Sequence, residues 1–129
     1  MLLAIGLQES RFRYRRQRGG PAKSYWQFEP AGIGGALQHH ASRPHALAVL
    51  DALDYPEYRD AIYEAIEDND VLSCCFARLL LFTDPAPLPQ IGQAAKSWSY
   101  YTRTWRPGRP RPDTWEECYS QAVQQVTER

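Results

Sequence analysis

The chain has 129 residues, of which 43% are hydrophobic and 23% are charged, as is typical of one soluble globular domain. Its 15 basic and 15 acidic residues give a formal net charge of zero, which argues against a nucleic-acid-binding protein that relies on overall charge. No run of about 20 apolar residues is present, so the sequence predicts no transmembrane helix and no membrane partner.

The first seven residues are apolar on every side, and Glu9 follows closely. A helix that is apolar all round is buried all round, and we predict such a helix over residues 1–9. Ile5 and Leu2 lie one and two turns before Glu9 on the same helix face. Apolar neighbours raise the pKa of a carboxyl group, as a general acid near neutral pH requires. Glu9 is therefore a candidate catalytic acid, and the alternative is a structural carboxylate paired with a nearby arginine.

The segment that follows this helix is rich in arginine. Five arginines lie within residues 11–18, and glycine and proline end the segment, so we predict a loop over residues 11–20. A solvated loop face is the plain interpretation, and binding of phosphate or of carboxylates is the alternative. Because Phe12 and Tyr14 interleave with the arginines, a nucleic-acid interface is a further alternative, which salt-dependent binding would support. Residues 24–29 fit a short strand or an extended loop.

Apolar residues recur at helical spacing through the rest of the chain, with prolines between the periodic segments. Asp70 is the expected N-cap of the central apolar helix, and Thr114 with Glu117 is the expected capping box of the last helix. The predicted helices cover residues 32–40, 44–53, 56–68, 71–82, 90–105 and a final segment from 114 onwards. We therefore predict a mainly α, single-domain protein over residues 1–129 with little or no sheet.

The cysteines do not indicate a disulfide framework. Cys74, Cys75 and Cys118 are an odd number, so they cannot all pair within the chain, and we expect free, buried thiols. The start of the chain lacks the basic segment and the small-residue cleavage site of a signal peptide. We therefore expect a protein that is made in the cytoplasm.

Two short motifs in the first quarter of the chain resemble those of the lysozyme-like superfamily. Glu9-Ser10 at a helix end resembles the first motif of soluble lytic transglycosylases and goose-type lysozymes. Residues 24–27, Ser-Tyr-Trp-Gln, align with their second motif, Gly-Leu-Met-Gln, and share its glutamine. With Trp-Gln-Phe-Glu at residues 26–29 and Trp-Arg-Pro-Gly at residues 105–108, the chain is most similar to small lysozyme-like proteins of phages and prophages.

This resemblance implies a lysozyme-like helical domain that binds the glycan strands of peptidoglycan. The reaction it implies is cleavage of the β-1,4 bond between N-acetylmuramic acid and N-acetylglucosamine, with Glu9 as the general acid and base. Glu29, two positions after the motif glutamine, would be a second catalytic carboxylate that holds a water molecule, and its alternative is a structural glutamate. The implied substrate-binding residues are Ser10, Tyr25, Trp26, Gln27, Tyr100 and Tyr101.

Several of these assignments have structural alternatives. Tyr25 and Trp26 could fill the core, and Gln27 could satisfy the backbone of its own loop. Tyr101 is the preferred match to a late tyrosine that the family keeps near the acid, and core packing is its alternative. The resemblance implies no cofactor. The histidines lack the spacing of a zinc-binding helix, so no metal site is expected.

The third motif of the family, Ala-Tyr-Asn-x-Gly, is absent, and the only asparagine is Asn69. The alternative function is therefore a catalytically inactive lysozyme-like phage protein with a structural or glycan-binding role. An active protein of this kind would reach the cell wall by phage-assisted release or as a virion component. Family members usually carry residues before the first helix, so two alternatives stay open: a short N-terminal extension is missing, or the helix begins abruptly. The sequence leaves the reaction product, the host and the oligomeric state open.

Overall fold

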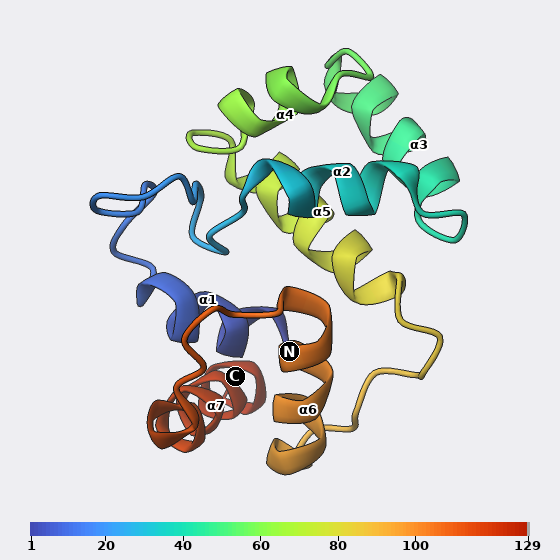
Figure 1. The fold of residues 1–129 in the computed structure, drawn as a ribbon. Coiled ribbons are helices and arrows are strands. Elements are labelled where there is room, and N and C mark those ends of the chain that lie inside the picture. The colour runs from blue at the N-terminus through green and yellow to red at the C-terminus, as the bar shows by residue number, and fades with distance from the viewer. Residues whose placement is uncertain (129) are drawn as a thin grey trace.

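Helices carry almost the entire fold. The computed structural model describes residues 1–128, which contain seven helices and no sheet (Figure 1). This confirms the predicted mainly α class. The helices are α1 (Leu2–Ser10), α2 (Pro30–Gln38), α3 (Arg43–Leu53), α4 (Arg59–Ala65), α5 (Asp70–Phe82), α6 (Ala94–Trp105) and α7 (Pro112–Thr127). No helix in this part of the chain is both long and apolar enough to cross a bilayer.

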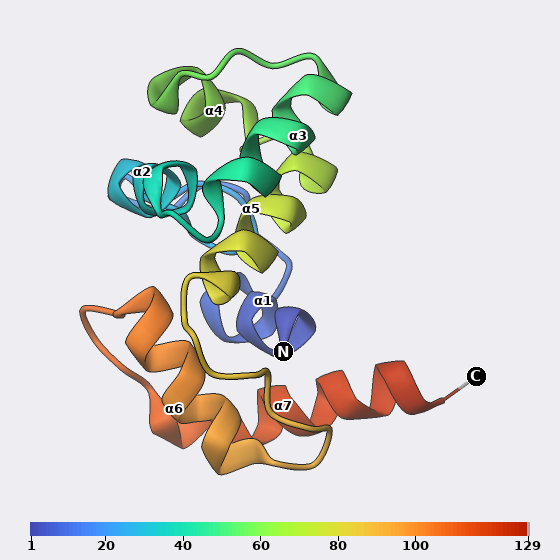
Figure 2. The same ribbon diagram turned by 90° about the vertical axis from the view of Figure 1, so that its right-hand side faces the viewer.

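Helix α5 joins two groups of helices into one domain. In Figures 1 and 2, α2, α3 and α4 lie at one end of the molecule and α1, α6 and α7 at the other. Helix α5 runs between the groups and contacts α2 and α3 on one side and α1 and α6 on the other. Its side chains Leu72, Phe76 and Leu81 are fully buried in one continuous hydrophobic core. The apolar segment that the sequence places at the centre is therefore the centre of the fold.

Helix α1 is buried on most sides but not on all. Ala4 and Ile5 are fully buried in the core, whereas Leu3 is 38% exposed. The expectation that the first helix is buried on every side is therefore wrong. The helix packs against α7 and α5, and Leu3 is its one exposed residue.

The start of α5 corrects the predicted cap. Asn69 is the N-cap, and its side-chain oxygen accepts a hydrogen bond of 3.0 Å from the backbone N–H of Leu72. The amide nitrogen of Asn69 also donates to the Tyr55 hydroxyl at 2.9 Å. Asp70, the predicted cap, is instead the first residue of the helix. It lies in the first turn, where a negative charge interacts favourably with the helix dipole.

The start of α7 also differs from the prediction. The helix begins at Pro112, because proline has no N–H to leave unpaired at the first helical position. Thr114 therefore lies inside the helix, and the predicted capping box with Glu117 does not form. The Thr114 hydroxyl lies 2.9 Å from Gln8 Oε1, and Gln8 Nε2 donates to the Arg111 carbonyl at 2.8 Å. Gln8, the neighbour of Glu9, thus fastens the end of α1 to α7.

Other helix boundaries shift by a few residues. Helix α2 begins at Pro30, before the predicted glycine-rich start at residue 32. Helix α4 covers only Arg59–Ala65 of the predicted 56–68, and α6 begins at Ala94 instead of residue 90. Pro30 is the first residue of α2, Pro56 lies shortly before α4 and Gly92 shortly before α6, and such residues set a helix start more sharply than the apolar periodicity does.

The arginine-rich segment after α1 is a loop, as predicted, and two of its arginines are anchored. Arg15 pairs with Asp70 at 2.9 Å, and Arg16 pairs with Glu67 at 2.7 Å. Because these pairs are largely exposed, each contributes little to stability, but together they hold the loop beside the start of α5.

The segment of residues 24–29 is a tight turn between single β-bridges. Lys23 forms isolated bridges with Arg16 and with Phe28, and the Lys23–Phe28 hydrogen bonds measure 2.8 and 2.7 Å. Between them, Ser24 and Gln27 adopt left-handed backbone conformations, with φ of 71° and 55°. The segment is therefore closer to the predicted extended loop than to a strand.

All three cysteines are free, as predicted. Cys118 is buried in α7, whereas Cys74 and Cys75 on α5 are only half-buried, so the expected burial holds for one thiol of the three. Burial raises the pKa of the Cys74 and Cys118 thiols.

Candidate active site

Glu9 lies in the last turn of α1, directly before a sharp change of chain direction. Arg11, with φ of 57°, ends the helix and donates its N–H to the Leu7 carbonyl at 3.0 Å. The buried Ser10 hydroxyl lies 2.7 Å from the carbonyl oxygen of Tyr25 and accepts the Phe12 N–H at 3.1 Å. Ser10 therefore fixes the end of α1 to the loop that carries the motif glutamine.

Tyr101 of α6 holds the Glu9 carboxyl group. Its hydroxyl donates a hydrogen bond to Glu9 Oε1, across 92 positions of sequence. The Tyr101 ring stacks in parallel on Trp115 of α7, with ring centroids 5.2 Å apart. Burial and the neighbouring Glu9 carboxyl raise the pKa of Tyr101, so the phenol keeps its proton and remains a donor. This is the contact that the resemblance leads us to expect of a late tyrosine.

The environment of Glu9 favours its protonated form. Burial raises the pKa of the Glu9 carboxyl from 4.5 to about 7, and the hydrogen bond from Tyr101 opposes this rise. None of the ion pairs within residues 1–128 includes Glu9. The alternative of a structural glutamate paired with arginine would require a lowered pKa. Glu9 can therefore both donate and accept a proton near neutral pH.

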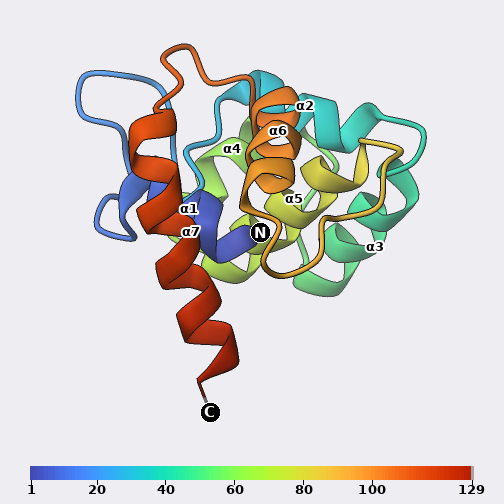
Figure 3. The ribbon, with the colours of Figure 1, turned by 90° about the horizontal axis from the view of Figure 1, so that it is seen from below.

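An open cleft of about 450 Å³ begins at Glu9. One wall comes from the loop between α1 and α2, and the other from the end of α6 and the loop that leads to α7. Figure 3 shows these two loops side by side at one edge of the molecule. The cleft is lined by Glu9, Gln17, Ala22, Gln27, Glu29, Trp105, Arg106, Pro107, Gly108 and Arg109.

Two further predicted site residues share this cleft with Glu9. Gln27 lines it while donating its side-chain N–H to the Ser24 carbonyl at 2.8 Å, so it both orders its loop and faces the cleft. Glu29 is exposed in the cleft and precedes α2, but its side chain makes no capping hydrogen bond. The structure therefore brings together Glu9, Gln27 and Glu29, with Tyr101 behind the first.

Tyr25 and Trp26 are not among the side chains that line the cleft. Trp26 is only 6% exposed, and its indole N–H donates to the Leu2 carbonyl at 2.9 Å. The Tyr25 ring packs edge-on against Phe12 at 5.4 Å and lies beneath the Arg15 guanidinium at 4.6 Å. Both side chains pack the loop onto the core, which is the alternative to their predicted contact with substrate.

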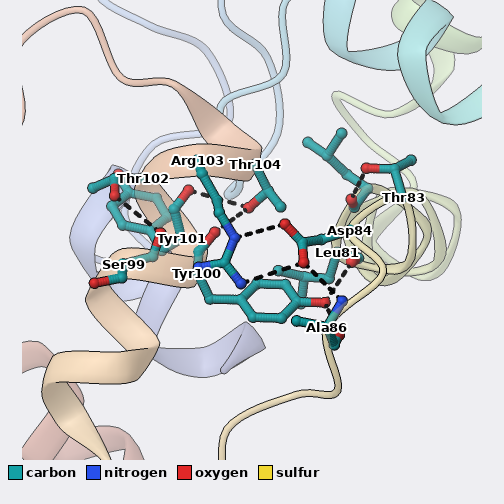
Figure 4. A network of polar contacts seen from close by, with 11 residues as sticks. Leu81, Thr83, Asp84, Ala86, Ser99, Tyr100, Tyr101, Thr102, Arg103 and Thr104 are labelled. Carbon is teal, nitrogen blue, oxygen red and sulfur yellow. Dashed lines mark hydrogen bonds and ion pairs between the residues drawn. The ribbon is translucent and has the colours of Figure 1, made fainter.

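Tyr100 also lies outside the cleft, one position before Tyr101 but on a different face of α6. Its hydroxyl lies 2.8 Å from the Leu81 carbonyl (Figure 4). Arg103 lies over the Tyr100 ring at 4.6 Å and forms an ion pair with Asp84 at 2.6 Å. This network ties α6 to the end of α5, so Tyr100 has a structural position and not the predicted substrate-binding one.

Seven residues that line the cleft were not among the predicted site residues, and four of them have polar or aromatic side chains: Gln17, Trp105, Arg106 and Arg109. The Trp105 indole is only partly buried, and its N–H donates to the Trp26 carbonyl at 2.9 Å. The sequence indicates a stiff extended loop after this tryptophan, and Trp-Arg-Pro-Gly at residues 105–108 contributes to the family resemblance, but no site role is predicted for these residues. The available signal was the position of Trp105 one helical turn after Tyr101, which places both side chains on neighbouring parts of the same face.

Within residues 1–128, no three His, Cys, Asp or Glu side chains cluster in a way that could hold a metal ion. Compared with known protein families, curated proteins and solved structures, the chain matches none.

Proposed function

We propose that the protein cleaves the glycan strands of peptidoglycan as a lysozyme-like lytic transglycosylase or muramidase. The observation that carries this proposal is the Glu9 carboxyl group, which has a pKa of about 7 and a hydrogen bond from Tyr101 at the end of an open cleft. A carboxyl group that is half protonated near neutral pH can give a proton to a glycosidic oxygen. The Glu-Ser motif and the motif glutamine support the choice of peptidoglycan as the substrate.

The first step is the same for both reaction types. Glu9 protonates the oxygen of the β-1,4 bond, the bond to the muramic C1 breaks, and the Glu9 carboxylate remains. In a lytic transglycosylase, this carboxylate then removes the proton of the muramic C6 hydroxyl, whose oxygen bonds to C1 and closes a 1,6-anhydro ring. In a hydrolase, a water molecule held by Glu29 adds at C1 instead, and the proton that this water loses passes to the Glu29 carboxylate.

The cleft offers other groups that suit a sugar chain. The partly exposed Trp105 ring provides an apolar surface on which a sugar ring can stack. The amides of Gln17 and Gln27 can exchange hydrogen bonds with sugar hydroxyl and acetamido groups. We assign glycan binding to these three side chains.

Mass spectrometry of purified cell-wall sacculi after digestion tests this function. The expected result is release of soluble muropeptides, with 1,6-anhydro ends from a transglycosylase or with reducing ends, heavier by one water molecule, from a hydrolase. Sacculi that sediment with the protein but release no muropeptides would assign a glycan-binding role and refute the enzymatic one.

A further inference from the structure

Two arginines in the wall of the cleft have no acidic partner. The segment from α6 to α7 contains four arginines, of which Arg103 and Arg111 lie 2.6 and 3.5 Å from aspartates. Arg106 and Arg109 form no ion pair within residues 1–128, and both are exposed where they line the cleft. Their charges are therefore available to a ligand in the cleft.

The chain fixes Arg106 beside the other cleft residues. Arg106 ends α6 in a left-handed conformation, with φ of 49°, and donates its N–H to the Thr102 carbonyl at 3.0 Å. The preceding Trp105 is held by its hydrogen bond to the Trp26 carbonyl. The next residue, Pro107, limits the freedom of the backbone as it leaves the helix. The backbone of Arg106 is therefore held in place directly after Trp105, the side chain on which we propose that a sugar ring stacks.

The charge of the cleft differs from that of the whole chain. The formal net charge of the protein is zero. When Glu9 is protonated, as a general acid must be, the charged groups that line the cleft are Arg106, Arg109 and Glu29. Two guanidinium groups against one carboxylate leave the cleft positive, and guanidinium groups bind carboxylates with paired, charge-assisted hydrogen bonds.

We propose that Arg106 and Arg109 form an anion-binding subsite that recognises carboxylates carried by the glycan substrate. This inference rests on the proposed function for the identity of the glycan. Peptidoglycan offers two sources of carboxylate: the peptide stems, and the lactyl group of the muramic residue when its stem has been removed. The enzyme would then prefer peptidoglycan to uncharged polymers of N-acetylglucosamine.

Binding titrations with three substrates test the subsite without requiring cleavage. Intact sacculi fragments carry stem carboxylates, amidase-treated strands carry only lactyl carboxylates, and chito-oligosaccharides carry neither. The variants are Arg106→Gln and Arg109→Gln, alone and combined, with Arg106→Lys as a charge-retaining variant. Arg78→Gln removes an exposed arginine on α5 that does not line the cleft, and it serves as the matched control. Thermal melting of each variant verifies that it is folded.

The combined variant should weaken binding to carboxylate-bearing glycan by about three- to tenfold, the range for exposed charge pairs with some charge-assisted hydrogen bonding. The effect should shrink at high salt, should be absent with chito-oligosaccharides and should be small in Arg106→Lys. A loss confined to intact fragments identifies the stems as the source, and a loss on stripped strands identifies the lactyl group.

Equal losses on chito-oligosaccharides, unchanged binding to all three substrates, or no binding by the unaltered protein would overturn the inference. Failure of the proposed function looks different. In that case arginine-dependent binding persists while no muropeptides are released. Conversely, cleavage with unaltered binding in the combined variant would refute the subsite alone.

Discussion

Replacing Glu9 by glutamine should make the protein more stable at neutral pH and remove a pH dependence from its stability. The folded protein holds the Glu9 proton up to a pH of about 7, whereas the unfolded chain releases it near 4.5. Between these values the folded state binds more protons than the unfolded state, so the free energy of unfolding falls as the pH rises. Stability contributed by the protonated group is present below 4.5 and is lost by the time the pH passes 7.

The size of this effect follows from the two pKa values. Their difference, from 4.5 to about 7, corresponds to about 3 kcal/mol at about 1.4 kcal/mol per pKa unit. That is a large part of the roughly 5–15 kcal/mol by which a domain is stable. Glutamine keeps the shape of the side chain and can still accept the Tyr101 hydrogen bond. Glu9→Gln should therefore match the unaltered protein below pH 4.5 and exceed it by about 3 kcal/mol above pH 7.

Urea unfolding at a series of pH values measures this difference. Glu116→Gln is the matched control, because Glu116 is an exposed glutamate on α7 with no hydrogen-bond or ion-pair partner in residues 1–128. It should change stability little at any pH. If Glu9→Gln became less stable than the unaltered protein as the pH rose towards 7, the Glu9 carboxylate would be stabilising the fold. That result would refute the expectation that burial raises the pKa of Glu9.

Three further predictions follow from single contacts. Tyr101→Phe keeps the ring but removes a hydrogen bond that lowers the pKa of Glu9. The part of the pH–activity profile that reports the ionisation of Glu9 should therefore move to higher pH. If it stayed in place or moved to lower pH, the hydrogen bond from Tyr101 to Glu9 would be contradicted. Asn69→Ala should reduce the free energy of unfolding by about 1 kcal/mol in urea titrations, the usual value for a lost N-cap, and an unchanged midpoint would rule out this cap. A thiol reagent should modify all three cysteines after unfolding without reductant, with Cys118 the slowest in the folded protein, and two oxidised thiols would contradict the free state.

The sequence was sufficient to predict most helices and the position of Glu9. Apolar periodicity indicated the helices after the first one because packing against one core imposes that spacing along the chain. Helix ends were less predictable, because Asn69 and Asp70 are both good capping residues. Only the backbone conformation at Asn69, outside the helix, decides between them.

The predicted aromatic contacts show the limit of local reasoning. Tyr25 and Trp26 stand next to the motif glutamine, but in a tight turn the sequence does not show which side chains point inwards. Tyr100 and Tyr101 are neighbours on a helix, so their side chains project about 100° apart and only Tyr101 reaches Glu9. Which of the two faces the acid depends on how α6 packs beside α1, and that packing involves residues far apart in the chain.

The residues that form the second wall of the cleft could not be predicted from the sequence for the same reason. Trp105, Arg106 and Arg109 lie about 100 positions after Glu9, and they reach the cleft because α7 packs against α1 and Tyr101 of α6 hydrogen-bonds to Glu9. The hydrogen bonds of Gln8 with Arg111 and Thr114 hold the end of α1 against the start of α7. The Trp-Arg-Pro-Gly sequence at residues 105–108 contributes to the family resemblance, but it does not show by itself that this loop lines the cleft.

The rate at which Glu9→Gln releases muropeptides from purified sacculi tests the central claim most directly. The comparison is with the unaltered protein and with Glu116→Gln, at a pH below the Glu9 pKa of about 7, and binding to sacculi is measured in parallel. If Glu9 is the general acid, the variant should lose at least about 100-fold in rate, the low end for general acid catalysis, while it still binds the wall. An active unaltered protein with an equally active Glu9→Gln variant would contradict the account.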